Sequence, residues 1–149
     1  MLIDTTRFGQ VDVDETKIIT FNDGILGFPA QRRYALIQTS PDPIFFWLQA
    51  LEDAALAFVV CDPLAFVADY QAPVRQDDVE ALGLRDLSDA QVLVICNKVD
   101  GHVTANLLGP IVVGVHSLRA KQLVLSDKRY STRQRLMRLE AAAPISKTA

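Results

Sequence analysis

Residues 104–125 read TANLLGPIVVGVHSLRAKQLVL and contain two apolar, β-branched runs, 104–115 and 121–125, on either side of a polar turn. This pattern is typical of paired β-strands. Gly109-Pro110 interrupts the first run, and proline cannot donate to a strand ladder, so we expect a bend, a bulge or an edge there. The stretch therefore predicts a corner in a β-sheet.

The same stretch separates an acidic region from a basic one. Residues 1–115 hold 7 Lys or Arg and 16 Asp or Glu, whereas residues 116–149 hold 8 and 2. The formal net charge of −3 therefore conceals two regions of opposite charge.

The composition indicates one domain. At 149 residues, half of them hydrophobic, the chain is long enough to build its own core. No apolar run approaches the ~20 residues that cross a bilayer, and Asp4 stands where a secretory signal would carry basic residues. We therefore expect a cytoplasmic protein with no membrane partner. Cys61 and Cys96 lie in apolar runs and are expected to be buried free thiols.

Further strand candidates precede this stretch, with turn residues at the spacing of sandwiches and barrels. They are residues 7–13, 17–21, 34–38, 45–50, 57–61 and 92–96. Two helices are expected: residues 76–82, ended by Gly83, and a basic amphipathic helix over 131–143. The fold class predicted is mainly β, a small single-domain β-barrel-like fold with one or two short helices. Its domain spans 1–135, and 136–149 form a basic C-terminal helix or tail, disordered at its end.

The chain shows no catalytic motif. Asn97-Lys98-Val99-Asp100 is similar to the guanine-recognition loop of GTPases, but no glycine-rich phosphate loop accompanies it, so a polar hairpin turn is the better interpretation. His102 and His116 lack partners at ligand spacing. We expect no enzyme activity, no metal site and no cofactor.

Two groups of residues have alternative interpretations. Phe45, Phe46 and Trp47, with Tyr70, either fill the core or form a partner-binding patch, because three consecutive aromatic residues on a strand cannot all face one side. The basic C-terminal segment either contacts RNA phosphates or is a solvated helix face. The second is favoured because no interleaved aromatic residues accompany the charges.

Over about residues 1–135 the sequence resembles the flagellar assembly factor FliW family. The matching positions are Phe21, Gly24-Ile25-Leu26-Gly27-Phe28-Pro29, Trp47-Leu48-Gln49, Ala57-Phe58-Val59-Val60, Pro63, Tyr70, Asn106-Leu107, Pro110-Ile111-Val112, Ala120, Gln122 and Tyr130. Gly24, Gly27, Phe28, Asn106, Pro110 and Gln122 form the structural part of this signature. Gly114 departs from the pattern, which usually has a polar residue there.

The resemblance implies a β-barrel-like protein without catalysis that binds the C-terminal region of cytoplasmic flagellin. When released, such a protein binds CsrA, an RNA-binding repressor of flagellin translation, and relieves the repression. The alternative is an RNA-binding regulatory domain that uses the basic C-terminal segment; otherwise no direct contact with nucleic acid is expected. We expect a monomer.

Residue chemistry suggests where the two partners bind. The charge of Asp77, Asp78 and Glu80, on a helix expected to be exposed, makes them the candidate CsrA face. Apolar Phe46, Trp47 and Tyr70 are the candidate flagellin site, since an amphipathic helix needs an apolar groove. Residues 104–125 are expected to close the barrel.

Overall fold

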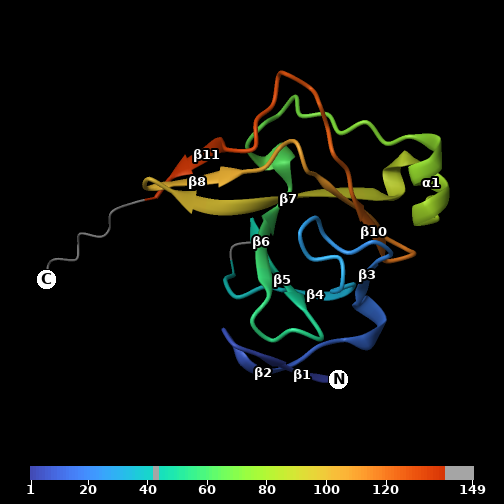
Figure 1. Cartoon of the computed structure of the whole chain (residues 1–149), viewed down its shortest axis with the longest axis vertical. Coiled ribbons are helices and arrows are strands. Elements are labelled where there is room, and N and C mark those ends of the chain that lie inside the picture. The colour runs from blue at the N-terminus through green and yellow to red at the C-terminus, as the bar shows by residue number, and fades with distance from the viewer. Residues whose placement is uncertain (42–43, 140–149) are drawn as a thin grey trace, which may run out of the picture.

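The computed structural model of the chain describes residues 1–41 and 44–139 (Figure 1). Its strands are β1 (Leu2–Thr5), β2 (Gly9–Asp12), β3 (Ile19–Phe21), β4 (Arg33–Ile37), β5 (Phe45–Ala50), β6 (Ala57–Cys61), β7 (Ala90–Val99), β8 (His102–Ala105), β9 (Ile111–Gly114), β10 (Arg119–Gln122) and β11 (Gln134–Arg138). The helices of this part of the chain are α1 (Gln76–Leu82) and the 3-10 turns η1 (Glu15–Lys17), η2 (Pro63–Ala65) and η3 (Leu87–Asp89). Within it, no helix is long and apolar enough to span a bilayer.

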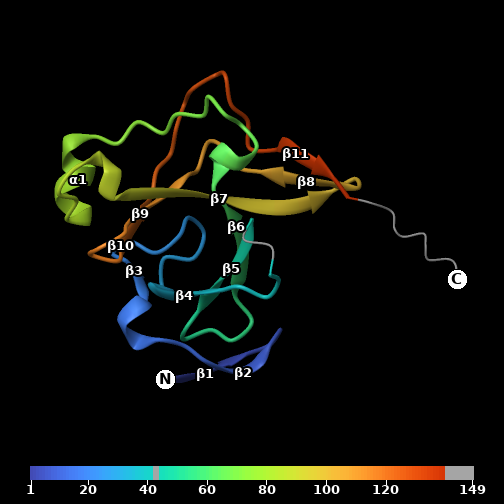
Figure 2. The same cartoon turned by 180° about the vertical axis from the view of Figure 1, so that it is seen from behind.

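The main sheet closes on itself. Its nine strands run in the order β11-β8-β7-β6-β5-β4-β3-β10-β9, and β9 also pairs with β7. The ring is therefore β3-β4-β5-β6-β7-β9-β10, with β10 and β3 parallel. Strands β8 and β11 lie outside the ring, and the β1–β2 hairpin lies at the end near the N-terminus (Figures 1 and 2). The predicted mainly-β barrel is confirmed.

Residues 104–125 form the expected corner. The long strand β7 pairs with β8 near its end, where Cys96 lies opposite Ala105, and with β9 near its start, where Leu93 lies opposite Ile111. Between β8 and β9 the chain turns through residues 106–110, which include Gly109-Pro110. The turn ends the hairpin with β8 and redirects the chain into the ring, so this stretch closes the barrel.

Two hydrophobic clusters lie on the two faces of the ring strands. The first takes residues from every ring strand and so fills the barrel interior: Ile19, Phe21, Ile25, Tyr34, Leu48, Ala50, Val60, Leu93, Ile111, Val113 and Ala120. The second packs on the outer face of β6 and β7 and continues over β8: Cys61, Tyr70, Val94, Cys96, Val103, Ala105 and Leu107. Cys61 and Cys96 are free and buried, as expected, with their sulfur atoms 3.5 Å apart.

The first predicted helix is confirmed and the second is wrong. Helix α1 spans Gln76–Leu82, and Gly83 follows in the left-handed conformation. Residues 134–138, expected to be helical, form strand β11 instead, paired with β8. Without β11, the backbone of β8 would be an unpaired edge, and this pairing outweighs the helical spacing of Leu136 and Leu139. Residues 140–149, including the expected disordered end, lie outside the described part of the chain.

Candidate partner-binding groove

The loop after β3 exposes the apolar side chain of Leu26 to solvent. Gly24 has a φ of 68°, and a Cβ at this position would lie 2.6 Å from the carbonyl oxygen of Phe28. Only glycine fits there. The loop then turns back on itself, with the Phe28 amide donating to the Ile25 carbonyl at 2.6 Å. Ile25 is buried in the barrel, whereas Leu26 is 74% exposed.

The Gln122 side chain fixes this loop to the corner of the sheet, and the Asn106 side chain stabilises the corner itself. The Leu26 amide donates to Gln122 Oε1 at 2.8 Å, and Gln122 Nε2 donates to the Gly109 carbonyl at 3.0 Å. Asn106 Oδ1 accepts from the Leu108 amide at 3.0 Å. The signature residues Gly24, Asn106 and Gln122, distant in sequence, therefore act on one local structure. Gly24 and Gln122 hold the backbone of Leu26 in a fixed position.

The remaining signature residues support the same loop. Gly27 has a φ of 91°, which favours glycine. The Phe28 ring packs edge-on against Phe58 of β6, with centroids 5.4 Å apart, and remains 41% exposed. Pro110 is buried, and its carbonyl accepts from the Leu123 amide at 2.8 Å. The loop and the corner thus form one packed unit.

An open groove of about 460 Å³ runs beside this loop. Its lining comes from the loop, from β6, β7, β8 and β10, from the corner and from the segment before β11: Ile25, Leu26, Phe58, Ile95, Asn97, Lys98, Val99, Thr104, Asn106, Gln122, Thr132 and Arg133. The lining combines an apolar floor with polar and cationic side chains. Such a surface can bury an apolar side chain of a partner and hydrogen-bond to its flanks.

The three acidic residues expected on one exposed helix differ in environment. Asp77 and Glu80 are exposed. Asp78 is buried: it accepts from Lys121 Nζ at 2.7 Å and from the Arg75 amide at 3.0 Å. Burial alone would raise the pKa of Asp78, but these two hydrogen bonds outweigh it and lower the pKa. The expected exposure of Asp78 is therefore wrong, and its carboxylate joins α1 to β10.

The three aromatic residues expected to form one apolar site are separated. Phe46 packs toward the barrel interior. Trp47 points to the opposite face of β5. There its ring centroid lies 5.6 Å from that of Phe8 and 4.7 Å from the Arg7 guanidinium carbon. Tyr70 is buried in the second cluster, and its hydroxyl donates to the Leu107 carbonyl at 2.7 Å. They do not form a common surface.

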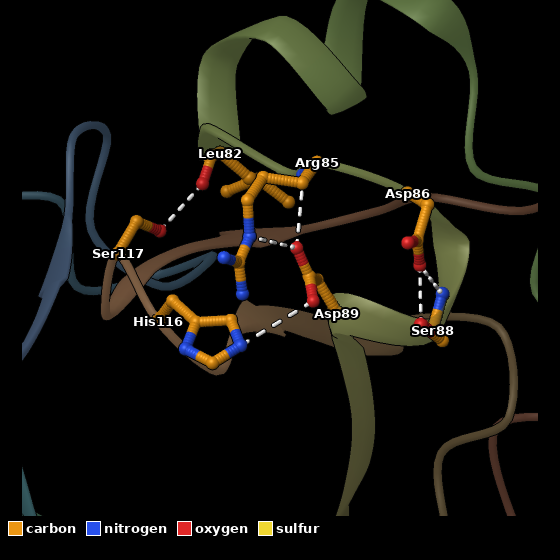
Figure 3. A network of polar contacts seen from close by, with 7 residues as sticks. All are labelled: Leu82, Arg85, Asp86, Ser88, Asp89, His116 and Ser117. Atoms are coloured by element: carbon orange, nitrogen blue, oxygen red, sulfur yellow. Dashed lines mark hydrogen bonds and ion pairs between the residues drawn. The ribbon is translucent and has the colours of Figure 1, made fainter.

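A polar network fixes the far end of α1 (Figure 3). Asp89 accepts from the Arg85 amide at 2.9 Å and from its guanidinium at 3.2 Å, and His116 Nε2 lies 3.5 Å from the carboxylate. The amide hydrogen bond, aided by the guanidinium and by His116, lowers the pKa of Asp89. Ser117 Oγ donates to the Leu82 carbonyl at the end of α1. The network joins the helix to the β9–β10 turn.

The GTPase-like motif forms no loop. Asn97 and Lys98 lie within β7, and the polar turn begins only at Asp100, which has a φ of 50°. Over residues 1–41 and 44–139, no group of three His, Cys, Asp or Glu side chains is arranged to hold a metal ion.

Sequence reasoning missed the contribution of Leu26, Lys98 and Arg133 to a surface. In the sequence, Leu26 is only one of the positions that match the FliW pattern. The available signal was a large apolar residue next to glycine in a turn, a position where the side chain often points outward. Lys98 and Arg133 come together only through the pairing of β7, β8 and β11, which the expected C-terminal helix excluded.

Comparisons with known proteins agree on one family. The family model described as FliW protein matches residues 2–136. The flagellar assembly factor FliW of Alkaliphilus metalliredigens is 36% identical over 140 residues, covering 92% of this chain and 86% of that protein. That of Bdellovibrio bacteriovorus is 38% identical over 136 residues, covering 90% and 78%. A crystal structure of the flagellar assembly factor FliW matches with a TM-score of 0.84 and 32% identity, over 92% of this chain and 97% of that one.

Proposed function

Because the chain belongs to the FliW family of flagellar assembly factors, we propose that it is a non-catalytic cytoplasmic protein that binds the C-terminal region of flagellin. When flagellin is absent, the free protein binds CsrA and relieves repression of flagellin synthesis. The proposal rests on family membership and on a surface suited to binding.

The observation that supports flagellin binding is the exposed Leu26 beside the groove. An isolated exposed leucine is common, but Leu26 is held in place by a hydrogen bond from its own amide to Gln122. Because the backbone that carries this side chain is already fixed, the loop loses little conformational entropy on binding. We place the flagellin site here, in place of the separated Phe46, Trp47 and Tyr70.

Titration of purified flagellin into the full chain tests this site. We expect Leu26→Asp to weaken binding at least tenfold, because it places a charge where an apolar contact forms. Leu87→Asp is the matched control, since Leu87 is 65% exposed and does not line the groove. Equal affinities for the two variants would refute the site. Absence of binding by the unchanged chain would refute the function.

For CsrA, the proposed face is the exposed pair Asp77 and Glu80. Asp78 is left out because its carboxylate is already bonded to Lys121. We expect the double variant Asp77→Lys with Glu80→Lys to bind CsrA more weakly and with slower association, since exposed charges steer encounter. Asp4→Lys with Glu15→Lys is the control of equal charge change, on other exposed positions. If both variants lose affinity equally, only net charge matters and the face is misplaced.

A further inference from the structure

We propose that the groove selects an acidic amphipathic segment of its partner, whose carboxylates contact Arg133 and Arg135 while its apolar side chains contact Leu26. The inference rests on the proposed flagellin site and adds the charge of the segment that it takes.

The first support is the charge of the lining. Among the described residues that line the groove, two are cations, Lys98 and Arg133, and none is an acid. Both side chains are exposed. The ion pairs of residues 1–41 and 44–139 involve other groups, so neither cation is neutralised by an acid of that part of the chain. Their charge is available to a partner.

The strand register shows which cations lie on the groove face. Arg135 of β11 lies opposite Thr104 of β8, and Thr104 lies opposite Asn97 of β7. Residues directly opposite one another point to the same face of a sheet. Asn97 and Thr104 both line the groove, so Arg135, which is exposed, lies on the same face. Arg133 and Arg135 are therefore the cations on the groove face, whereas Lys98, next to Asn97 in β7 and opposite Val103, points its side chain to the other face of the sheet.

The arrangement favours a protein partner over RNA. Leu26, the exposed apolar side chain of the lining, offers no ring on which a base could stack, and the Phe58 ring is already packed against Phe28 and Tyr34. The acidic residues concentrated in residues 1–115 would also repel an extended phosphate backbone. A segment with apolar and acidic side chains can contact both Leu26 and the arginines, whereas RNA can pair only with the arginines.

Binding of purified flagellin, measured from low to high salt, tests the charge requirement. We expect Arg133→Glu with Arg135→Glu to weaken binding about tenfold at low salt and to reduce its salt dependence. Lys17→Glu with Lys128→Glu is the matched control, because it makes the same charge change at exposed positions that do not line the groove. Thermal unfolding of each variant checks that the fold is retained.

The outcomes separate this inference from the function on which it rests. Suppose that Leu26→Asp abolishes flagellin binding while Arg133→Glu with Arg135→Glu binds as well as its control. The groove is then the flagellin site, but the requirement for an acidic segment is refuted. If the unchanged chain binds no flagellin, the proposed function fails first. If it binds a structured RNA instead, and the arginine variant alone loses that binding, the basic side of the groove is an RNA site and the inference is overturned.

Discussion

Gly114, the position that departs from the family pattern, has a physical explanation in the contact between β9 and the end of α1. A Cβ there would lie 2.9 Å from the Leu82 carbonyl oxygen and 2.5 Å from Ser117 Oγ. We expect Gly114→Ala to lower the free energy of unfolding by about 1–3 kcal/mol, because the added methyl group must displace the helix end. Urea denaturation measures this.

A second substitution separates the two contacts of Gly114. Ser117→Ala removes the hydroxyl but leaves the Leu82 carbonyl in place. Because a backbone carbonyl cannot rotate away as a side chain can, Ser117→Ala should not restore stability to Gly114→Ala. Full recovery in the double variant would show that the serine hydroxyl was the whole obstacle, and that α1 can shift without cost.

Asp78 should make stability depend on pH in the acid range. Its pKa is lower in the folded protein than its ordinary value of 3.8, so the carboxylate stabilises the fold fully above that value. This contribution is lost as the pH falls below 3.8 through the folded pKa. We expect Asp78→Asn to lower the free energy of unfolding by about 1–2 kcal/mol at pH 7. On acidification, the free energy of unfolding should then fall less for this variant than for the unchanged chain.

Urea denaturation at a series of pH values from 7 to about 3 measures this effect of Asp78, a range that spans the ordinary aspartate pKa. The control is Asp77→Asn, which changes the neighbouring, exposed carboxylate of the same helix. It should leave stability at pH 7 almost unchanged. Identical pH profiles for Asp78→Asn and the unchanged chain would show that the Lys121 contact does not stabilise the fold.

The elements that their own residues signal could be predicted from the sequence. The elements that form only by pairing with a strand distant in sequence could not. Gly109-Pro110 predicts the corner, because proline has no amide N–H to donate to a neighbouring strand. Helix α1 is predicted by its acidic first turn and by the glycine that follows it. Strand β11 has no comparable local signal. Leu136 and Leu139 fit a helical face equally well, and only the open edge of β8 decides for a strand.

The candidate site shows the same division. The two glycines around Ile25 and Leu26 predict a tight turn. Which apolar side chain points outward, however, depends on the hydrogen bond that the Leu26 amide donates to Gln122, almost a hundred residues away in sequence. The separation of Phe46 from Trp47 likewise depends on what covers each face of β5, which is the barrel interior for Phe46 and the Arg7 and Phe8 side chains for Trp47. Sequence periodicity gives the faces of a strand but not what covers them.

Pro110→Asp tests the corner as an element. The position is buried, and its carbonyl accepts from the Leu123 amide. An aspartate there buries a carboxylate with no cationic partner, so we expect a loss of about 3 kcal/mol or more. Circular dichroism and thermal unfolding should show this loss before any specific loss of flagellin binding. A variant with unchanged stability that no longer binds would instead identify the corner as part of an interface.

At the scale of the whole molecule, the barrel ring closes without β11, and this makes the boundary of the domain testable. A chain that ends at Ser131 lacks β11, whereas a matched control that ends at Leu139 keeps it. The ring pairs are intact in both, but the shorter chain exposes the edge of β8 and loses the contacts of Leu136 and Leu139 with the second cluster.

We expect the chain that ends at Ser131 to be less stable than its control by about 2–4 kcal/mol, from the lost burial of two partly buried leucines. This corresponds to roughly 5–15 °C in Tm. Unfolding should remain a single cooperative transition, because the closed ring is complete. A chain that fails to fold would show that β11 is integral to the barrel, while an unchanged Tm would place the end of the domain before it. Since Arg133 and Arg135 are also removed, the shorter chain should bind flagellin more weakly than its control even where both are fully folded.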